Sequence, residues 1–184
     1  MDIQIPEADH GITEGLVQSI APSIGEIALS WGFIESHLRA VYWTLERTHG
    51  VPMPTEKAGF DVVVDIIRQA CVKLPEFDQS KGSLGGLLRA AASEAKTLGV
   101  VRNTVCHWTL TSAKEGMKGK QTKLQFVQWR GNNGLNVFQE KWYGVEELRN
   151  LATRSIQLGS LLAELASEAV ERLEPDHPER GGGP

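Results

Sequence analysis

The sequence predicts a mainly α-helical protein, an antiparallel bundle of about four helices with a small β-ribbon inserted between the third and fourth helices. Apolar residues recur in alternating steps of three and four over four long segments, which is the spacing of one helix face. Between the last two segments the pattern changes to the alternation typical of strands. A length of 184 residues is sufficient for one domain with a substantial core.

The first helix is expected to follow an irregular lead-in over residues 1–22, which carry Pro6, Gly11 and Gly15. Ser23 and Glu26 have the spacing of a capping box, which predicts that the helix begins at residue 23. Gly50, with prolines shortly after it, predicts the end. The expected buried stripe is Ile24, Ile27, Trp31, Ile34, Leu38, Val41 and Leu45.

The second and third helices are expected over about 57–74 and 83–108, with a loop over 75–82 between them. The β-branched run Val62-Val63-Val64 is also compatible with a strand. The length of the segment and its polar opposite side favour a helix. The stripe expected on the third helix is Leu84, Leu88, Ala91, Ala95, Leu98, Arg102 and Val105, so that a guanidinium occupies an apolar position.

A ribbon of two or three antiparallel strands is predicted between residues 108 and 141, with a turn at Gly131-Asn132-Asn133-Gly134. A last helix should run from Val145 to Leu173. Residues 23–173 would then form a single domain, and the charged, Gly-rich residues 174–184 a disordered tail. The inner stripe expected on the last helix is Val145, Leu148, Ala152, Ile156, Leu162, Ala166, Ala169 and Leu173.

The composition is that of a globular protein and argues against a membrane-spanning one. Apolar residues make up 41% and charged residues 23% of the chain, as in globular proteins, and no apolar run is long enough to span a bilayer. The acidic N-terminus lacks the features of an export signal, so we expect a cytoplasmic protein without a membrane partner. Cys71 and Cys106 are expected to be reduced, and the spacing of cysteines and histidines predicts neither a metal site nor a cofactor.

Three polar residues near the end of the third helix could carry chemistry. Asn103 and His107 are four residues apart, so their side chains can touch. Arg102 points about 140° away from His107 on a helical wheel and needs a partner for its charge. It could pair with Glu35 or Glu26 of the first helix, a structural interpretation, and His107 could simply be a histidine near a helix end.

The functional interpretation takes these residues together. RNA cleavage without a metal needs a group that removes a proton from the 2′-hydroxyl and returns one to the leaving oxygen, which suits histidine. It also needs positive charge on the phosphate, which suits the planar fork of arginine. Asn103 could orient the imidazole or bind a phosphate oxygen. Because Arg102 and His107 diverge on the wheel, two copies of the chain are expected to focus both groups on one phosphate.

The segment Arg102-Asn103-Thr104-Val105-Cys106-His107 resembles the Arg-polar-x-x-x-His signature of the HEPN superfamily. The resemblance covers residues 23–108 and 145–173 and leaves the ribbon unexplained. It implies a helical bundle, usually dimeric, that cleaves RNA without a metal to leave a cyclic phosphate, and a role in toxin–antitoxin systems or phage defence. One toxin branch has a tyrosine, modified by its partner, two residues after the histidine, whereas Thr109 stands here.

A basic segment follows the motif. Between Thr109 and Arg130 five residues are basic and only Glu115 is acidic, in a chain of net charge −4. Lysines could hold phosphates while Phe126 and Trp129 stack on bases. Alternatively, this is a solvated hairpin whose lysines discourage edge pairing and whose aromatic residues pack on the bundle. The candidate RNA-binding residues are Lys114, Lys118, Lys120, Lys123, Arg130 and Trp129.

Two functions are compatible with these residues. The first is a homodimeric HEPN-type endoribonuclease that acts on RNA, with an antitoxin or another protein as a further partner. The second is a non-catalytic helical interaction module in which Arg102 is buried against Glu35 and the ribbon binds a protein.

Overall fold

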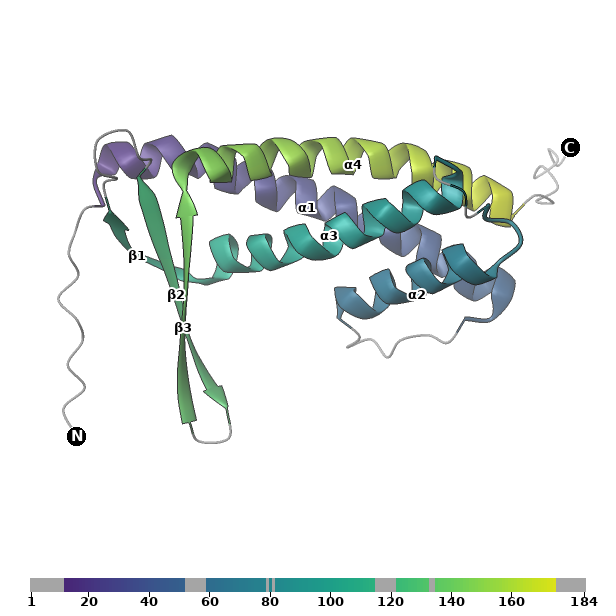
Figure 1. Ribbon diagram of the computed structural model, residues 1–184, viewed down its shortest axis with the longest axis horizontal. Helices are drawn as coiled ribbons and strands as arrows, with labels where there is room; N and C mark the ends of the chain where they lie inside the picture. The colour runs from purple at the N-terminus through teal and green to yellow at the C-terminus, as the bar shows by residue number, and fades with distance from the viewer. Residues whose placement is uncertain are drawn as a thin grey trace, which may run out of the picture. The chain divides into compact units, whose positions relative to one another are not determined.

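The computed structural model describes residues 12–51, 59–78, 80, 82–114, 122–132 and 135–174, and it confirms the mainly α class (Figure 1). Four helices and a three-stranded antiparallel sheet make up this part of the chain, with the sheet between the third and fourth helices. The elements are α1 (Glu14–His49), α2 (Phe60–Lys73), α3 (Leu84–His107), β1 (Thr109–Lys114), β2 (Lys123–Asn132), β3 (Leu135–Gly144) and α4 (Val145–Leu173).

The start of α1 differs from the sequence prediction. The helix begins at Glu14, and the side chain of Thr13 accepts a hydrogen bond from the backbone N–H of Leu16 at 3.2 Å, as an N-cap residue does. Pro22 therefore lies inside the helix, where it costs one backbone hydrogen bond. Ser23, the expected cap, is 6% exposed. The helix extends beyond the predicted start because the apolar stripe continues back to the buried Ile20.

The chain divides into two compact units. One comprises residues 30–99 and 156–184, and its described part contains α2 with segments of α1, α3 and α4. The α2 segment is helical, which excludes the strand alternative. Apolar side chains from all four helices form its core; the largest that are fully buried are Ile34, Leu38, Val41, Leu45, Ile67, Leu88, Leu98 and Leu162.

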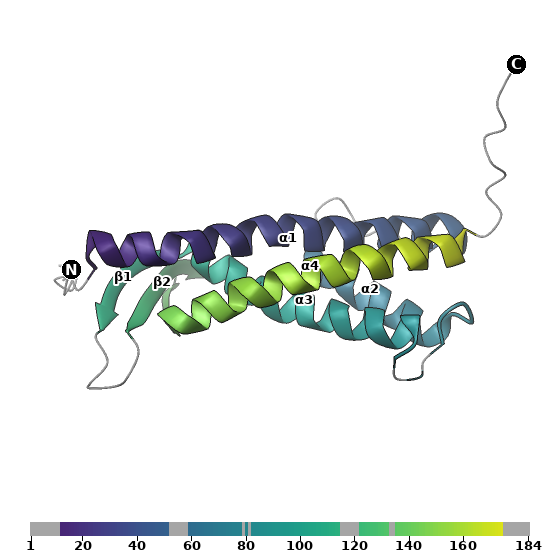
Figure 2. The same ribbon diagram turned by 90° about the horizontal axis from the view of Figure 1, so that it is seen from above.

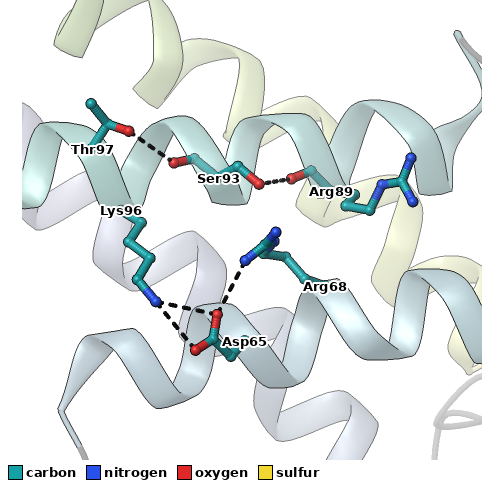
Figure 3. Close-up of polar contacts among 6 residues, drawn as sticks. All are labelled: Asp65, Arg68, Arg89, Ser93, Lys96 and Thr97. Atoms are coloured by element: carbon teal, nitrogen blue, oxygen red, sulfur yellow. Dashed lines mark hydrogen bonds and ion pairs between the residues drawn. The ribbon is translucent and has the colours of Figure 1, made fainter.

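Helix α3 runs antiparallel to the other three helices of this unit. The C-terminal end of α1 meets the C-terminal end of α4 through an ion pair between Arg47 and Glu174, so these two helices share one direction (Figure 2). Lys96 of α3 contacts Asp65 of α2 (Figure 3). In the same view the two helices run in opposite directions, because the direction from Lys96 to Arg89 in α3 is that from Asp65 to Arg68 in α2. Asp65 also accepts a hydrogen bond from Arg68 at 3.3 Å.

The inner stripe of α4 departs from the prediction at Val145, which is half-buried, and more clearly at Ile156. Ile156 is 46% exposed, whereas Leu151, Leu158 and Leu165 are buried. The predicted stripe contained one row of residues along the helix. The buried face of α4 is wider and includes the neighbouring row that contains these leucines. Among the described residues, no helix has both the length and the apolar character needed to cross a bilayer.

The other unit comprises residues 1–29 and 100–155, and its described part contains the sheet. The strand order is β1-β2-β3, and β2 pairs with β3 without interruption from Lys123 opposite Gly144 to Asn132 opposite Leu135. Gly131 and Asn132 of the predicted turn thus belong to β2, and residues 133–134 lie outside the described residues. The last strand then passes directly into α4, where the side chain of Glu147 accepts a hydrogen bond from the N–H of Gly144.

Tyr143 fixes the end of β3 against α3. Its side chain is 8% exposed, and its hydroxyl forms a hydrogen bond with the side chain of Thr104. Burial raises the pKa of Tyr143, the bond to Thr104 lowers it and the charge of Glu147 raises it further. The sheet is therefore held beside the last turn of α3, which carries the candidate site.

Candidate active site at the end of α3

Arg102, Asn103 and His107 meet in the last turns of α3, and we call these three residues the α3 cluster. Nη1 of Arg102 donates a hydrogen bond to Oδ1 of Asn103 at 3.0 Å and lies 3.1 Å from Nε2 of His107. Asn103 and His107 are exposed, and Arg102 is half-buried. His107 is the last residue of the helix. The cluster is therefore formed within one chain and is accessible from solvent.

The contact between Arg102 and His107 indicates which ring nitrogen of the imidazole accepts a hydrogen bond. A guanidinium can only donate hydrogen bonds, so Nε2 of His107 must accept. An imidazole that accepts at Nε2 is neutral and carries its proton on Nδ1. Neutral imidazole is the form that can remove a proton from a hydroxyl group.

The expectation that Arg102 and His107 diverge on one helix is corrected, because their side chains touch within one chain, whereas the homodimer itself stays a prediction. A helical wheel describes the direction of the Cα–Cβ bond, and the positions of these two bonds indeed diverge. The arginine side chain extends several bonds beyond its Cβ atom, and its tip bends back along the helix to reach both Asn103 and His107. The length of the arginine side chain, which a helical wheel does not represent, makes the contact possible.

Glu35, the expected partner of Arg102, has a different partner. Its carboxylate accepts hydrogen bonds from Nε and Nη2 of Arg39 at 2.9 and 2.7 Å, one turn along α1. A contact of Glu35 with Arg102, which belongs to the other unit, stays a prediction. A neighbour on the same helix needs no tertiary contact to pair, which favours it over a residue distant in the sequence.

Within the part of the chain that is described, the guanidinium of Arg102 is incompletely satisfied. Its Nε atom is buried and has no hydrogen-bond partner there. An unpaired buried donor of this kind costs about 1–3 kcal/mol, which is unusual for a group that serves only to hold a fold together. Arg102 also acts on Cys106, where burial raises the pKa of the thiol and the positive charge of Arg102 lowers it.

A cleft of about 520 Å³ lies beside the α3 cluster. Asn103 belongs to both, and the ring of Trp108, the residue after the helix, forms part of the wall. The ammonium group of Lys141 lies 5.5 Å from the centroid of that ring, a cation–π arrangement. We call this the Trp108 cleft; it is lined by Val100, Asn103, Thr104, Trp108, Gln139, Glu140 and Lys141.

Three comparisons with known proteins gave no match. Neither models of protein families, nor curated proteins, nor solved structures match the chain. What the protein does must therefore follow from the residues of the site and their geometry.

The predicted RNA-binding residues of the ribbon fall into three groups. Lys114 and Lys123 are exposed and opposite each other in β1 and β2, and Lys114 lies 5.0 Å from the ring centroid of Trp142. Lys118 and Lys120 lie outside the described residues. Trp129 and Arg130 belong to the backbone of β2, but their side chains are not among those described.

Phe126 corrects one part of the RNA-binding prediction. Its side chain is 2% exposed and packs edge-on against Tyr143, with ring centroids 5.9 Å apart. It therefore belongs to the core of its unit and cannot stack on a base.

The site residues predicted from the sequence do not include Trp108, Gln139 or Lys141. Trp108 stands directly after the motif, and a tryptophan four residues after Thr104 is a signal that could have placed it beside the cluster. Gln139 and Lys141 come from β3, and their position depends on strand register and on the anchoring of Tyr143. These positions depend on tertiary structure, and no local sequence pattern indicates them.

Proposed function

We propose that this protein is a metal-independent endoribonuclease in which the α3 cluster cleaves the RNA chain. The observation that supports the proposal is the convergence of a guanidinium, an amide and an imidazole at one solvent-accessible point, with Nη1 of Arg102 3.1 Å from Nε2 of His107. Phosphoryl transfer from the 2′-hydroxyl needs a base and a positive charge within reach of one phosphate. The cluster provides both.

In the proposed reaction, the phosphate of the RNA draws the guanidinium of Arg102 to its oxygens. Binding of Arg102 to phosphate also offers a partner to its buried Nε donor, and bidentate contact of an arginine with phosphate is strong. Once Nη1 leaves Nε2 of His107, that nitrogen is free to accept a proton. Asn103 keeps its side chain beside both groups.

His107 then takes the proton of the 2′-hydroxyl, and the 2′-oxygen attacks phosphorus. A new bond forms between the 2′-oxygen and phosphorus while the bond to the 5′-oxygen breaks. The products are a 2′,3′-cyclic phosphate and a 5′-hydroxyl end, whose oxygen receives a proton. The charge that builds on the phosphate oxygens in the transition state is met by Arg102.

We further propose that the active form is a homodimer. Attack and departure take place on opposite sides of phosphorus, so one imidazole is poorly placed to serve both oxygens. A second copy of the chain, related by a two-fold axis, would supply a second His107. Once its own Nε2 is released by Arg102, this imidazole takes up a proton from solvent and passes it to the leaving oxygen. The resemblance of the motif extends the proposal to a role as a toxin or a defence effector, with an antitoxin as a further partner.

The test is incubation of the purified protein with mixed RNA in the presence of a chelator, followed by analysis of the product ends. We expect cyclic phosphate and 5′-hydroxyl ends. His107→Ala should slow cleavage by about 10²–10⁴-fold, as expected for loss of a general acid–base group. His37→Ala on α1 is the matched control and should cleave at the wild-type rate. Cleavage by His107→Ala at the rate of this control would contradict the role of His107.

Arg102→Ala should also abolish cleavage, with Arg89→Ala as its control on the exposed surface of α3. Removing Arg102 takes away the donor that occupies Nε2 of His107 and leaves no buried charge behind, so the fold should persist. Circular dichroism would verify this. An Arg102→Ala protein that is folded and fully active would rule out the guanidinium as the group that stabilises the phosphate.

A non-catalytic interaction module is the second candidate function, and one observation favours it. Two large apolar side chains on α1, Phe33 and Trp43, are 64% and 56% exposed, as residues at a protein interface often are. The same assay separates the candidates. A wild-type protein that forms complexes and leaves RNA intact under every condition supports the module.

A further inference from the structure

The Trp108 cleft combines elements that are distant in the sequence. Val100, Asn103 and Thr104 face it from α3, and residues 139–141 face it from β3, the strand at one edge of the sheet. Its volume of about 520 Å³ is within the range of about 300–1,000 Å³ that small-molecule sites occupy. The cleft is therefore large enough for one nucleoside, and its chemistry decides what it would hold.

Most of the lining is polar, and only some of the polar groups are available to a ligand. The hydroxyl of Thr104 donates to the carbonyl of Val100 at 2.9 Å and is bonded to Tyr143. Glu140 accepts a hydrogen bond from Gln125 at 2.6 Å. These contacts hold Thr104 and Glu140 in place as parts of the wall.

Two amide side chains of the lining remain able to form hydrogen bonds with a ligand. Oδ1 of Asn103 is occupied by Arg102, which leaves its NH₂ group to donate. Gln139 is exposed on β3 and can both donate and accept. Donors and acceptors in one plane are what the edge of a nucleobase requires.

Trp108 supplies the stacking surface. Its indole is half-buried, and the ammonium of Lys141 lies 5.5 Å from its centroid. Aromatic rings with nearby cations are how proteins bind single-stranded nucleic acid, because every base has a flat face and every nucleotide carries a phosphate. A peptide or an apolar ligand would find only Val100 and Trp108 as apolar lining residues.

We propose that the Trp108 cleft binds one base of the RNA next to the phosphate that is cut, with the base stacked on Trp108 and its edge read by Asn103 and Gln139. This inference rests on the proposed function for its position: Asn103 lies in the α3 cluster and in the wall of the cleft, so a nucleotide in the cleft is adjacent to Arg102 and His107. Lys141 provides positive charge for the backbone of that nucleotide. The cleft thereby determines where the RNA is cut.

The experiment measures binding separately from cleavage. Eight-residue 2′-O-methyl homopolymers of each base cannot be cleaved by 2′-hydroxyl attack, and their affinities for the full chain can be measured by fluorescence anisotropy. Stacking on Trp108 predicts that Trp108→Leu weakens the preferred homopolymer by about 5- to 150-fold. Trp43→Leu, which removes an exposed tryptophan of α1, should bind as the wild type does.

Two further measurements keep the test decisive if Trp108→Leu folds poorly. An abasic position placed in the preferred oligonucleotide should weaken binding to the wild type by a similar factor. Gln139→Ala, a change at an exposed residue, should reduce the difference in affinity between homopolymers. With RNA as substrate, the same variant should cut with a weaker preference for the base beside the cleavage site.

The outcomes distinguish this inference from the proposed function. Wild-type binding that is lost with Trp108→Leu, in a protein that cuts no RNA, supports the base site and contradicts the nuclease. RNA cleavage that continues with an unchanged site preference and unchanged affinity in Trp108→Leu and Gln139→Ala overturns the base site alone. A wild-type protein that binds none of the four homopolymers overturns the base site as well.

Discussion

Substitution of Gly99 by alanine tests the packing of α3 against α1. A Cβ atom at this position would lie 2.7 Å from Cη2 and 3.3 Å from Cζ3 of Trp31. The first distance is closer than carbon atoms approach in folded proteins. Trp31 is 7% exposed and its ring packs edge-on against Phe60 at 4.6 Å, so it cannot easily move aside.

The expected magnitude follows from two opposing effects. Alanine is favoured over glycine inside a helix by about 1 kcal/mol. Forcing an additional carbon atom into a packed core costs about 1–3 kcal/mol. Gly99→Ala should therefore leave the free energy of unfolding unchanged or lower it by up to about 2 kcal/mol, although the substitution improves helix propensity.

Gly32→Ala is the matched control, because Gly32 also lies inside a helix but a Cβ atom there would meet nothing within 4 Å. This variant should gain about 1 kcal/mol. The propensity terms cancel between the two variants, so their difference isolates the overpacking cost of about 1–3 kcal/mol. For a chain of this size that corresponds to melting temperatures about 2–12 °C apart.

Thermal and urea unfolding, followed by circular dichroism, would measure both variants. A third protein, Gly99→Ala combined with Trp31→Phe, lacks the ring atoms that clash and should recover much of the loss. Equal stabilisation by Gly99→Ala and Gly32→Ala would refute the close approach of α3 to the Trp31 ring, and with it the packing described for this unit.

Three other predictions concern stability. Burial raises the pKa of the Cys71 thiol to about 11. The free energy of unfolding should therefore be unaffected by this thiol below pH 9 and fall by about 1.4 kcal/mol per pH unit between pH 9 and 11. Urea titrations should show this slope in the wild type and a shallower one in Cys71→Ala. Tyr143→Phe removes the bond to Thr104 and should cost about 0.5–1.5 kcal/mol by the same measurement. Asp65→Asn breaks ion pairs whose side chains are 39–46% exposed and should change stability by less than about 1 kcal/mol; a larger loss would show that this network is more than a surface feature.

The helices could be predicted from the sequence because their buried faces repeat along the chain. Ile34, Leu38, Val41 and Leu45 are all fully buried, as their spacing indicates. The start of α1 could not be predicted in the same way. Pro22 is a strong local signal for a helix boundary, but the stripe that continues to Ile20 outweighs the cost of one missing hydrogen bond.

The candidate site could be predicted only in part. The spacing of Asn103 and His107 places them on one side of α3, and their common contact with Arg102 agrees with that inference. The conformation of Arg102 itself depends on side-chain torsions that periodicity does not describe. The far wall of the Trp108 cleft depends on the register of β3, since a shift of one residue would turn Gln139 and Lys141 to the opposite face of the strand.

In the proposed cleavage reaction, His107 must first be neutral and then carry a proton, and the location of the α3 cluster at the end of α3 is suited to both states. A hydrogen bond from the guanidinium of Arg102 needs Nε2 of His107 as its acceptor. After proton transfer the imidazolium lies at the C-terminal end of a 24-residue helix, where the unpaired carbonyl groups stabilise a positive charge. A phosphate that binds Arg102 changes His107 from the first environment to the second, because it removes the donor from Nε2 and adds negative charge nearby. Under the proposed function, the arrangement would couple the arrival of the RNA to the release of the base through residues of one helix.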